Sequence, residues 1–317
     1  MQSSRPTADL GDKILPFQIA ETAVRGRVIR LGPAIDEILT RHPFEASVKM
    51  LIGETAALVA MMGSSLKFDG RLIFQVQGDG PVPMLVSDYA ASGALRATAS
   101  VATDSALDEI PAIKDRAPMR VLMGNKAHIV VTVDQGPDME RYQGVTPLDG
   151  ATIAEAAVSY FDQSEQIPTA VKLGVGRIAG LDGKETWRAG GILAQFVPGE
   201  GGGRERGEAI LKGPEEQELW DRAAALLETT QLDELLDPMI ASETLLYRLF
   251  HEDGVRVFDP QPVRAECHCG AHKIEPVLSR YTAEDLADMA EDGVITVTCE
   301  FCRTDYRFAP DGALLAV

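Results

Sequence analysis

The chain has 317 residues, 45% of them hydrophobic, and a formal net charge of −18 from 48 acidic and 30 basic residues. This hydrophobic content is enough for a substantial core, and the length favours two or three domains. The negative charge argues against nucleic acid or an anionic membrane surface as a partner, because like charges repel over roughly 8–10 Å at physiological ionic strength.

The first five residues lead into a polar stretch without an apolar core, so no secretory signal peptide is expected. No run of about 18 apolar residues predicts a membrane-spanning helix. The expected location is therefore the cytoplasm, where thiols stay reduced, and no membrane partner is expected.

Apolar residues recur at strand or helix spacing through residues 1–199, which favours a domain that combines helices with an antiparallel sheet. Pro33 is expected at the first position of a helix, and Gly63 is expected to end a long buried helix. The predicted strands cover residues 22–30, 71–77, 84–88, 94–101, 128–134, 169–175 and 190–197, and the predicted helices cover 33–39, 44–62 and 152–161.

Two glycine-rich stretches resemble nucleotide-binding loops but lack the rest of each motif. Residues 78–81 have neither the Lys-Ser/Thr pair nor a following helix of a phosphate loop. Residues 174–180 have their third glycine one position late for a dinucleotide fingerprint, and they are interpreted as a hairpin turn. His128 has no serine or cysteine partner and is interpreted as an ordinary strand residue.

The glycines at 201–203, within residues 200–207, predict a flexible boundary. Residues 213–250 then predict short amphipathic helices, the first of which begins at Pro214. Between residues 213 and 248 there are nine acidic and two basic residues, which gives a net charge of −7. Because helices this short depend on tertiary packing, they should unfold when they lose the surface they pack on.

The only four cysteines form two close pairs, Cys267-His268-Cys269 and Cys299-Glu300-Phe301-Cys302, separated by 29 residues. Each pair can lie on a short turn that directs both sulfurs toward one point. Four thiolates at one point are the ligand set of a closed tetrahedral zinc site. The spacing therefore predicts one Zn²⁺ per chain, held by Cys267, Cys269, Cys299 and Cys302.

The spacing alone leaves other interpretations of this cluster open. Two structural disulfides would require an oxidising compartment. His268 or His272 could replace a cysteine ligand, although four sulfurs already complete a structural site. The zinc could be purely structural, or the site could act as a redox switch, because oxidation of the thiolates removes the ligands and releases the metal.

Residues 255–317 are predicted to form the metal-binding domain. This domain is too short for a self-sufficient core and needs bound zinc to stabilise its fold. The predicted elements are a strand at 255–258, a helix capped by Thr282 and ending near Ala290, a strand at 294–298 that leads into the second cysteine pair, and a strand at 303–308.

The chain resembles the thirty-three-kilodalton chaperonin family, the redox-regulated heat-shock holdases of bacteria, over nearly its whole length. The two cysteine pairs are the most specific part of the resemblance. The other matching stretches are residues 66–70 (LKFDG), 75–81 (QVQGDGP), 140–144 (ERYQG), 160–161 (YF), 164–166 (SEQ), 189–193 (AGGIL), 247–251 (YRLFH) and 258–260 (FDP).

The resemblance implies an α+β fold of three domains. These are an N-terminal α/β-sandwich-like domain with an antiparallel sheet (1–199), a stress-sensitive helical linker domain (200–254) and a small C-terminal zinc-binding redox-switch domain (255–317). It implies a chaperone rather than an enzyme. This chaperone would hold unfolding or oxidatively damaged proteins without ATP, and it would be inactive when reduced and zinc-bound. Oxidation would join Cys267 to Cys269 and Cys299 to Cys302, release zinc, unfold the linker and produce homodimers.

In the folded state the apolar stripes of the linker are expected to be buried on the N-terminal domain. Unfolding would expose them as a surface for client proteins. The candidate client-binding residues are Leu219, Trp220, Leu226, Leu227, Leu235, Leu236, Leu245 and Leu246.

The cysteine spacing also fits two other classes of protein. A zinc-ribbon module with purely structural zinc could bind nucleic acid or protein, but residues 261–317 carry ten acidic and five basic residues where phosphate binding needs a basic patch. A thiol–disulfide oxidoreductase places C-x-x-C at a helix N-terminus, whereas residues 303–308 predict a strand. A salt-dependent gel shift and an insulin-reduction assay separate these classes.

Overall fold

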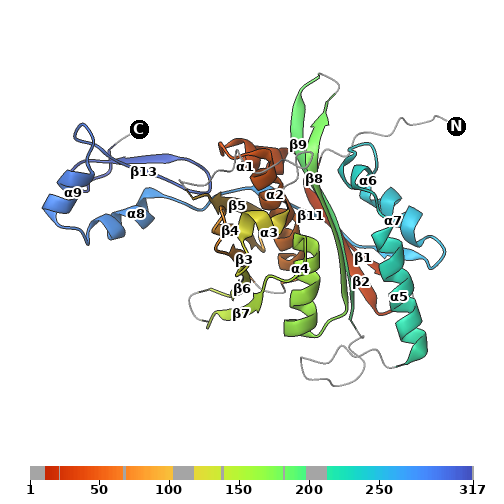
Figure 1. Cartoon of the computed structure of the whole chain (residues 1–317). Coiled ribbons are helices and arrows are strands. Elements are labelled where there is room, and N and C mark those ends of the chain that lie inside the picture. Colours follow the sequence, from red (N-terminus) through yellow and green to blue (C-terminus); the bar gives the residue numbers. More distant parts are fainter. Residues whose placement is uncertain are drawn as a thin grey trace. The chain divides into compact units, whose positions relative to one another are not determined.

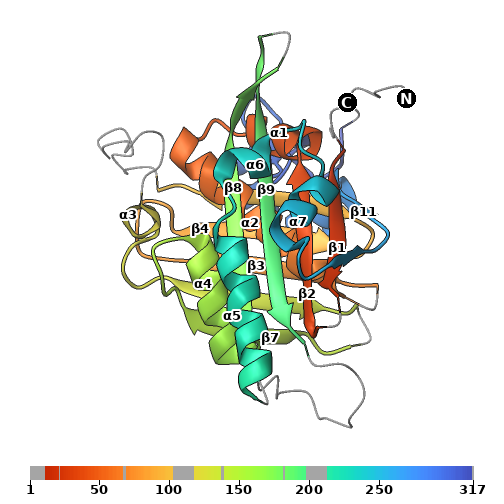
Figure 2. The same cartoon turned by 90° about the vertical axis from the view of Figure 1, so that its right-hand side faces the viewer.

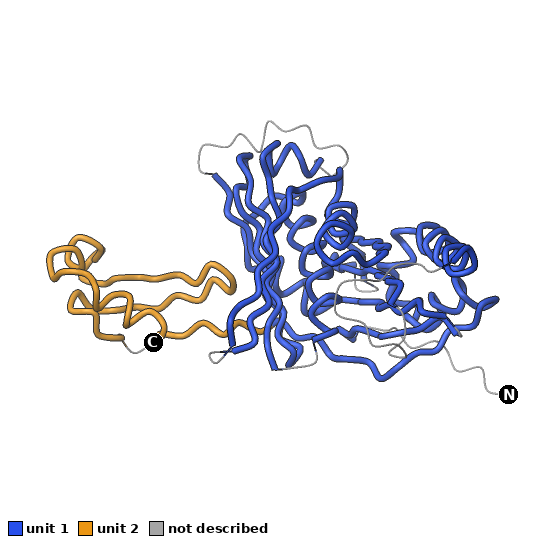
Figure 3. The backbone as a smooth tube through the Cα atoms, turned by 90° about the horizontal axis from the view of Figure 1, so that it is seen from below, with its two compact units in different colours: residues 1–265 blue, residues 266–317 orange. Residues whose placement is uncertain are grey.

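The structure is a computed structural model that describes residues 11–20, 22–66, 69–102, 118–136, 139–180, 183–197 and 213–315. It contains two compact units, residues 1–265 and 266–317, which are coloured separately in Figure 3. The division into three domains stays a prediction. The predicted flexible boundary at residues 200–207 lies outside the described residues.

The first unit is built on two sheets of six strands each. Sheet A has the order β10-β1-β2-β9-β8, with β11 also paired to β1, and sheet B has the order β12-β5-β4-β3-β6-β7. The strands of sheet A that come first in the chain are β1 (Lys13–Ile19), β2 (Val24–Leu31), β8 (Thr169–Ala179) and β9 (Glu185–Phe196). Those of sheet B are β3 (Arg71–Gln77), β4 (Met84–Ala90), β5 (Ala94–Ser100), β6 (His128–Asp134) and β7 (Tyr142–Pro147).

Helix α2 (Ala46–Gly63) lies between the two sheets, with α1 (Pro33–Thr40) and α4 (Ile153–Tyr160) in the same layer (Figure 1). Its sequence is apolar on all sides, which is the pattern of a helix buried all round. By length and composition α2 could cross a membrane, but 72% of its apolar window is buried inside this unit, as befits a core helix. Gly53 and Gly63 allow close packing, since an added Cβ would lie 2.9 Å from Val175 and 2.6 Å from Tyr89 respectively.

Three short helices cover the other face of sheet A, which Figure 2 shows from the front. They are α5 (Pro214–Glu228), α6 (Leu232–Leu236) and α7 (Ser242–Phe250). Their buried side chains join those of β1, β2, β8 and β9 in a second apolar cluster. At its centre the rings of Phe17 and Phe250 stack with their centroids 5.8 Å apart. The stability of these helices therefore depends on the sheet beneath them.

A strap of three short strands, residues 255–265, follows α7 and connects the two sheets. Strand β10 (Val255–Val257) and β11 (Gln261–Pro262) both pair with β1, and β12 (Arg264–Ala265) pairs in parallel with β5. The predicted strand at 255–258 is present, but it lies in the first unit rather than beside the cysteines. The chain is thus fastened to sheet B directly before it enters the second unit.

The second unit contains α8 (Ala271–Leu278), α9 (Ala283–Met289) and the antiparallel pair of β13 (Ile295–Thr298) and β14 (Asp305–Phe308). Thr282 caps α9 as predicted, and its hydroxyl accepts a hydrogen bond from the Asp285 amide. Among the described residues of this unit, the apolar cluster has four buried members, Leu278, Leu286, Ile295 and Phe308.

Several sequence predictions need correction. Residues 174–180 are not a hairpin turn: β8 continues to Ala179, and the Gly180 amide donates to the carbonyl of Lys184, the residue directly before β9. Alternation of side chains continues through the small residues, so the glycines do not interrupt the strand. The strands β1 and β7 and the helices α3 (Met119–Met123) and α8 were not anticipated.

Candidate metal centre

The four cysteines meet in the second unit. One sulfur atom from each of Cys267, Cys269, Cys299 and Cys302 lies within 4.8 Å of all the others. The Sγ atoms of Cys267 and Cys299 are 3.8 Å apart, and those of Cys269 and Cys302 are 3.3 Å apart. This group could hold a metal ion.

Zinc fits this donor set. Two sulfurs that each lie about 2.3 Å from a tetrahedral zinc are separated by about 3.8 Å. The observed sulfur separations bracket that value, so a small contraction around the ion would complete the coordination. Neither His268 nor His272 belongs to the metal-binding group found among the described residues.

The second cysteine pair lies on the turn between β13 and β14. Its ends are held together by two backbone hydrogen bonds, from the Cys299 amide to the Thr304 carbonyl and from the Arg303 amide to the Cys299 carbonyl. Arg303 has a positive φ of 58°, which lets the chain reverse directly after Cys302. The hairpin thereby directs both sulfurs to the same side of the turn.

The first pair lies on the segment between β12 and α8 and is tied to the hairpin by Tyr306 of β14. The Tyr306 hydroxyl lies 3.1 Å from the Cys269 Sγ. This hydrogen bond, followed by burial, raises the pKa of Tyr306 above its usual value, so the phenol stays protonated. Lys273 donates a hydrogen bond to the carbonyl of His268, which fixes the segment between the two cysteines.

The thiols of the second pair differ in acidity before any metal binds. Burial raises the pKa of the Cys302 thiol, but hydrogen bonds with the side chain and backbone of Thr304, and then with Cys269 and Cys299, together outweigh it and bring the pKa to about 6. Burial is also the largest influence on Cys299, whose pKa is raised. Cys302 is therefore the thiol of this pair that is more readily available as a thiolate ligand.

The candidate client-binding residues lie on the helices that cover sheet A. Most of them are buried, as predicted, and Trp220, Leu227 and Leu245 pack directly in the second apolar cluster. Leu226 is partly buried, whereas Leu219 is 40% exposed and does not belong to the buried stripe. Leu219 precedes Trp220 by one residue and so points away from the sheet, because adjacent helical residues do not share a face.

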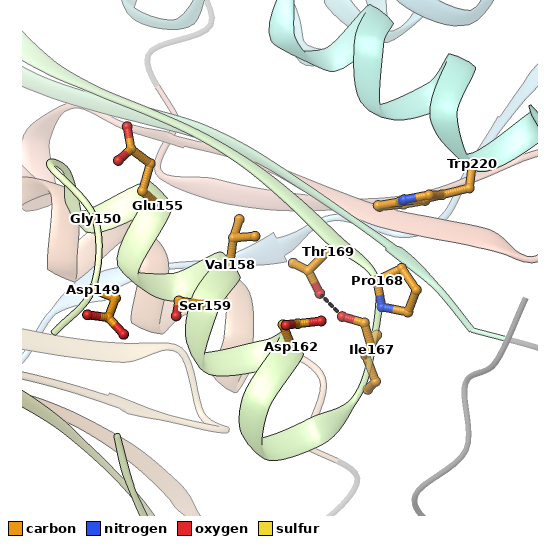
Figure 4. Close-up of a pocket in the computed structure, with 10 residues that line it drawn as sticks. All are labelled: Asp149, Gly150, Glu155, Val158, Ser159, Asp162, Ile167, Pro168, Thr169 and Trp220. Carbon is orange, nitrogen blue, oxygen red and sulfur yellow. Dashed lines mark hydrogen bonds between the residues drawn. The ribbon is translucent and has the colours of Figure 1, made fainter. Parts of the chain in front are cut away.

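Trp220 borders an open pocket of about 490 Å³ between α4, the start of β8 and α5 (Figure 4). Pro168 and Thr169 line the pocket below the indole. The side chain is 8% exposed, compared with 0% for Leu227 on the same helix. The contact between α5 and the sheet is therefore less enclosed near Trp220 than at the following turns.

Arg30 of β2 fastens α6 to the sheet, and the sequence analysis did not identify it. Its guanidinium, on a residue only 1% exposed, donates to the carbonyls of Glu234, Leu235 and Asp237 at 2.8–3.0 Å. These carbonyls lie at the C-terminal end of α6, where a positive charge is favourable. Arg30 is one of three arginines in β2, no periodic signal distinguishes it from the other two, and its partners lie more than 200 residues away in the chain.

Glycines in β8 and β9 form a flat surface beneath α6. A Cβ added to Gly190 would lie 2.4 Å from the backbone oxygen of Leu235, and one added to Gly176 would lie 3.1 Å from the Cδ1 of Leu236. The first contact is with backbone and forces the helix to move, whereas the second is with a side-chain end that can rotate away. Close approach of α6 thus depends on Gly190 in particular.

We expect Gly190→Ala to loosen α6 and Gly176→Ala to leave it nearly unchanged. Both substitutions place the same methyl group on a strand of sheet A, so they differ mainly in the contact each one makes with α6. Hydrogen exchange of residues 232–236 in the reduced protein measures the effect, and we expect at least tenfold faster exchange in Gly190→Ala. Equal exchange in the two variants would contradict a role for the Gly190 contact.

The fold and the centre define an α+β protein in which a unit with four gathered thiols, which could hold a metal ion, follows a two-sheet unit covered by helices. The family model described as Hsp33 protein matches residues 12–309. Two relatives are both called 33 kDa chaperonin. The one from Caulobacter vibrioides is 48% identical over 97% of this chain and 98% of the relative, and the one from Escherichia coli is 32% identical over 94% and 92%. The chain belongs to the Hsp33 family, and it is a chaperone that binds client proteins.

A crystal structure of the 33 kDa chaperonin homologue from Thermotoga maritima has the same fold. It superimposes with a TM-score of 0.75 at 22% sequence identity, and the match covers 95% of this chain and 96% of the other. The predicted α+β fold class is thereby confirmed.

Proposed function

We propose that the chain is a redox-regulated, ATP-independent holdase of the cytoplasm. In this proposal it is inactive when reduced and zinc-bound, and oxidation of the cysteines, zinc release and unfolding of the linker activate it. The observation that carries the proposal is the gathering of all four cysteines of the chain within 4.8 Å. A site that contains every thiol of the protein ties metal binding to the thiol redox state.

Cys267, Cys269, Cys299 and Cys302 are the proposed ligands of one Zn²⁺ per chain. A tetrahedral site of four thiolates is closed to substrate, so its role in the reduced state is to stabilise the fold rather than to catalyse a reaction. When bound, the ion also holds each thiolate in place as a separate ligand.

Oxidation by a peroxide is proposed to form Cys267–Cys269 and Cys299–Cys302. Each disulfide forms as a pair of thiolates gives two electrons to one peroxide molecule. The O–O bond of the peroxide breaks, and its two oxygens take up two protons from solvent and leave as water, or as water and an alcohol. All four sulfurs are close enough for other pairings. Neighbours in sequence are favoured because, once zinc has left and the unit has unfolded, the shortest loops close most often.

The linker helices α5, α6 and α7 are the proposed responsive element. The strap at residues 255–265 follows α7 directly and enters the second unit after Ala265. Loss of the second unit frees the end of this strap, whose last strand, β12, has only two residues. The partly enclosed contact at Trp220 offers a second place where the helices can separate from the sheet.

Unfolding of the linker would expose its leucines together with Trp220 and give a surface for unfolded client proteins. The side chains of Leu227, Leu235, Leu245 and Leu246 are at most 2% exposed when folded, and each contributes about 1.5–3 kcal/mol when it is buried again. The net charge of −7 between residues 213 and 248 helps to keep a complex with clients soluble. Homodimers are proposed for the oxidised form.

The test measures three quantities on the same samples of full-length reduced protein at increasing peroxide dose. These are zinc released, suppression of client aggregation, and disulfides mapped by peptide analysis. We expect one zinc per chain at the start, and zinc release that precedes or accompanies activity. The dominant crosslinks should be those within each cysteine pair.

Some outcomes would contradict the proposal. Reduced protein without zinc would remove its basis. Activity that is independent of peroxide dose would favour the alternative, a protein-interaction module with a purely structural zinc. Dominant crosslinks between the pairs, such as Cys269–Cys302, would refute the proposed disulfide pattern alone.

A further inference from the structure

A cavity of about 140 Å³ lies between the two sheets of the first unit. Sheet A contributes Arg27 and Leu193 to its wall, and sheet B contributes Val131 and Tyr142. Met61 and Met62, from the C-terminal end of α2, add to the apolar part of the lining. An apolar cavity of about 150 Å³ is large enough to bind benzene in other proteins.

Two charged side chains, Arg27 and Glu165, line the cavity, and no ion pair joins them. Among the described residues Arg27 makes no ion pair, and its Nε, which is shielded from solvent, has no hydrogen-bond partner. Burial disfavours the charged form of Arg27 and lowers its pKa, and the nearby Tyr89 only partly opposes this. The C-terminal end of α2 supplies about half a negative charge at most.

The strand position of Arg27 explains why it faces this cavity. Arg30 and Val28 point to the face of sheet A that the linker helices cover, and Arg27 lies on the opposite face. Burial of the Arg27 guanidinium between the sheets destabilises the folded state unless a partner accepts its hydrogen bonds.

We propose that the cavity binds a monocarboxylate that carries an apolar group about the size of a benzene ring. The carboxylate accepts hydrogen bonds from the Arg27 guanidinium, a pairing that is favoured by the planar fork of donors. The apolar group lies against Met61, Val131 and Leu193. The ligand bridges the two sheets and is independent of the thiol centre.

Glu165 restricts the charge of the ligand. Its carboxylate also lines the cavity, where it accepts a hydrogen bond of 3.2 Å from the Tyr160 hydroxyl. A second negative charge on the ligand would be repelled by this carboxylate in a poorly solvated space. The site therefore selects a monoanion over a phosphate ester or a dicarboxylate.

Benzoate and benzamide provide the test, because they have nearly the same shape and differ in charge. The reduced, metal-bound, full-length protein is labelled at the methionine methyl groups, and Met61→Leu and Met62→Leu identify the two signals from the cavity. We expect benzoate to shift these two signals saturably at millimolar concentration. Benzamide should bind at least tenfold more weakly.

Arg27→Met should lower benzoate affinity at least tenfold while the other methionine signals keep their positions, which shows that the unit is still folded. Arg25→Met is the matched control: Arg25 is an exposed residue two positions earlier on the same strand, and its loss should change the affinity less than twofold. The proposal is overturned if benzoate causes no saturable shift, if benzamide binds equally well, or if Arg27→Met binds benzoate undiminished.

Discussion

Removal of the metal from the reduced protein is expected to unfold residues 266–317 and to leave residues 1–265 with a folded core. Over its described residues, 266–315, the second unit has a buried apolar cluster of four side chains, Leu278, Leu286, Ile295 and Phe308, a core too small to sustain 52 residues. Zinc in small structural sites contributes about 10–16 kcal/mol, more than the roughly 5 kcal/mol that such a domain can otherwise reach. The folding equilibrium of this unit should therefore reverse completely.

Hydrogen exchange before and after chelation measures this effect. The amides of β13 and β14 should lose all protection, while those of β3 and β6 in the centre of sheet B should keep theirs. Cys302→Ser should reproduce the loss without a chelator, because it removes one ligand. Ser279→Ala is the matched control, since it removes an exposed hydroxyl from the same unit. Persistent protection of β13 and β14 in metal-free protein would show that the unit folds without metal.

The cysteine cluster could be predicted from the sequence because its information is local. Two short chelating pairs, with no other cysteine in the chain, leave few ways to satisfy four thiolates. The hairpin that positions Cys299 and Cys302 was also predictable from the apolar alternation on both sides of the pair. Tyr306 and Thr304 were not, because a hydrogen bond to sulfur leaves no pattern in the sequence.

The elements of the first unit were predicted where periodicity was strong, as in α2 and β3 to β6. The strand β1 was missed because Pro16 lies within it, and proline normally argues against a strand in the middle of a sheet. The strap at residues 255–265 was assigned to the metal domain by its position in the chain. Its pairing with β1 and β5 is a long-range contact that no local pattern encodes.

The packing of the linker helices on sheet A also depends on long-range contacts, which local sequence patterns do not predict. The stripes of leucine predicted an apolar face, and seven of the eight candidate residues are indeed at least partly buried. The surface that receives them depends on glycines of β8 and β9 and on Arg30, which are distant in sequence from the helices. Local propensity predicted the helices, and tertiary packing decides how firmly they are held.

Arg30→Met is expected to release α6 from sheet A while the metal centre stays intact. Methionine fills a similar length but cannot donate hydrogen bonds, so the carbonyls of Glu234, Leu235 and Asp237 lose their partner. Leaving these carbonyls unpaired should cost about 3 kcal/mol or more, which corresponds to a more than hundredfold increase in the open population of α6. Reduced Arg30→Met should then suppress client aggregation where the reduced wild-type protein does not.

Three measurements on Arg30→Met separate this route from activation through the metal. Zinc content should equal that of the wild type, hydrogen exchange should increase in residues 231–237, and exchange in β13 and β14 should not change. Arg25→Met, which removes an exposed arginine from the opposite face of the same strand, is the matched control and should behave like the wild type. Arg30→Lys should fall between the two, since an ammonium keeps the charge but lacks the planar fork that reaches three carbonyls.

If Arg30→Met keeps α6 protected, the guanidinium does not hold the linker. If it opens α6 without any gain in client binding, exposure of Leu235 and Leu236 is not sufficient, and the client surface requires release of α5 or α7 as well.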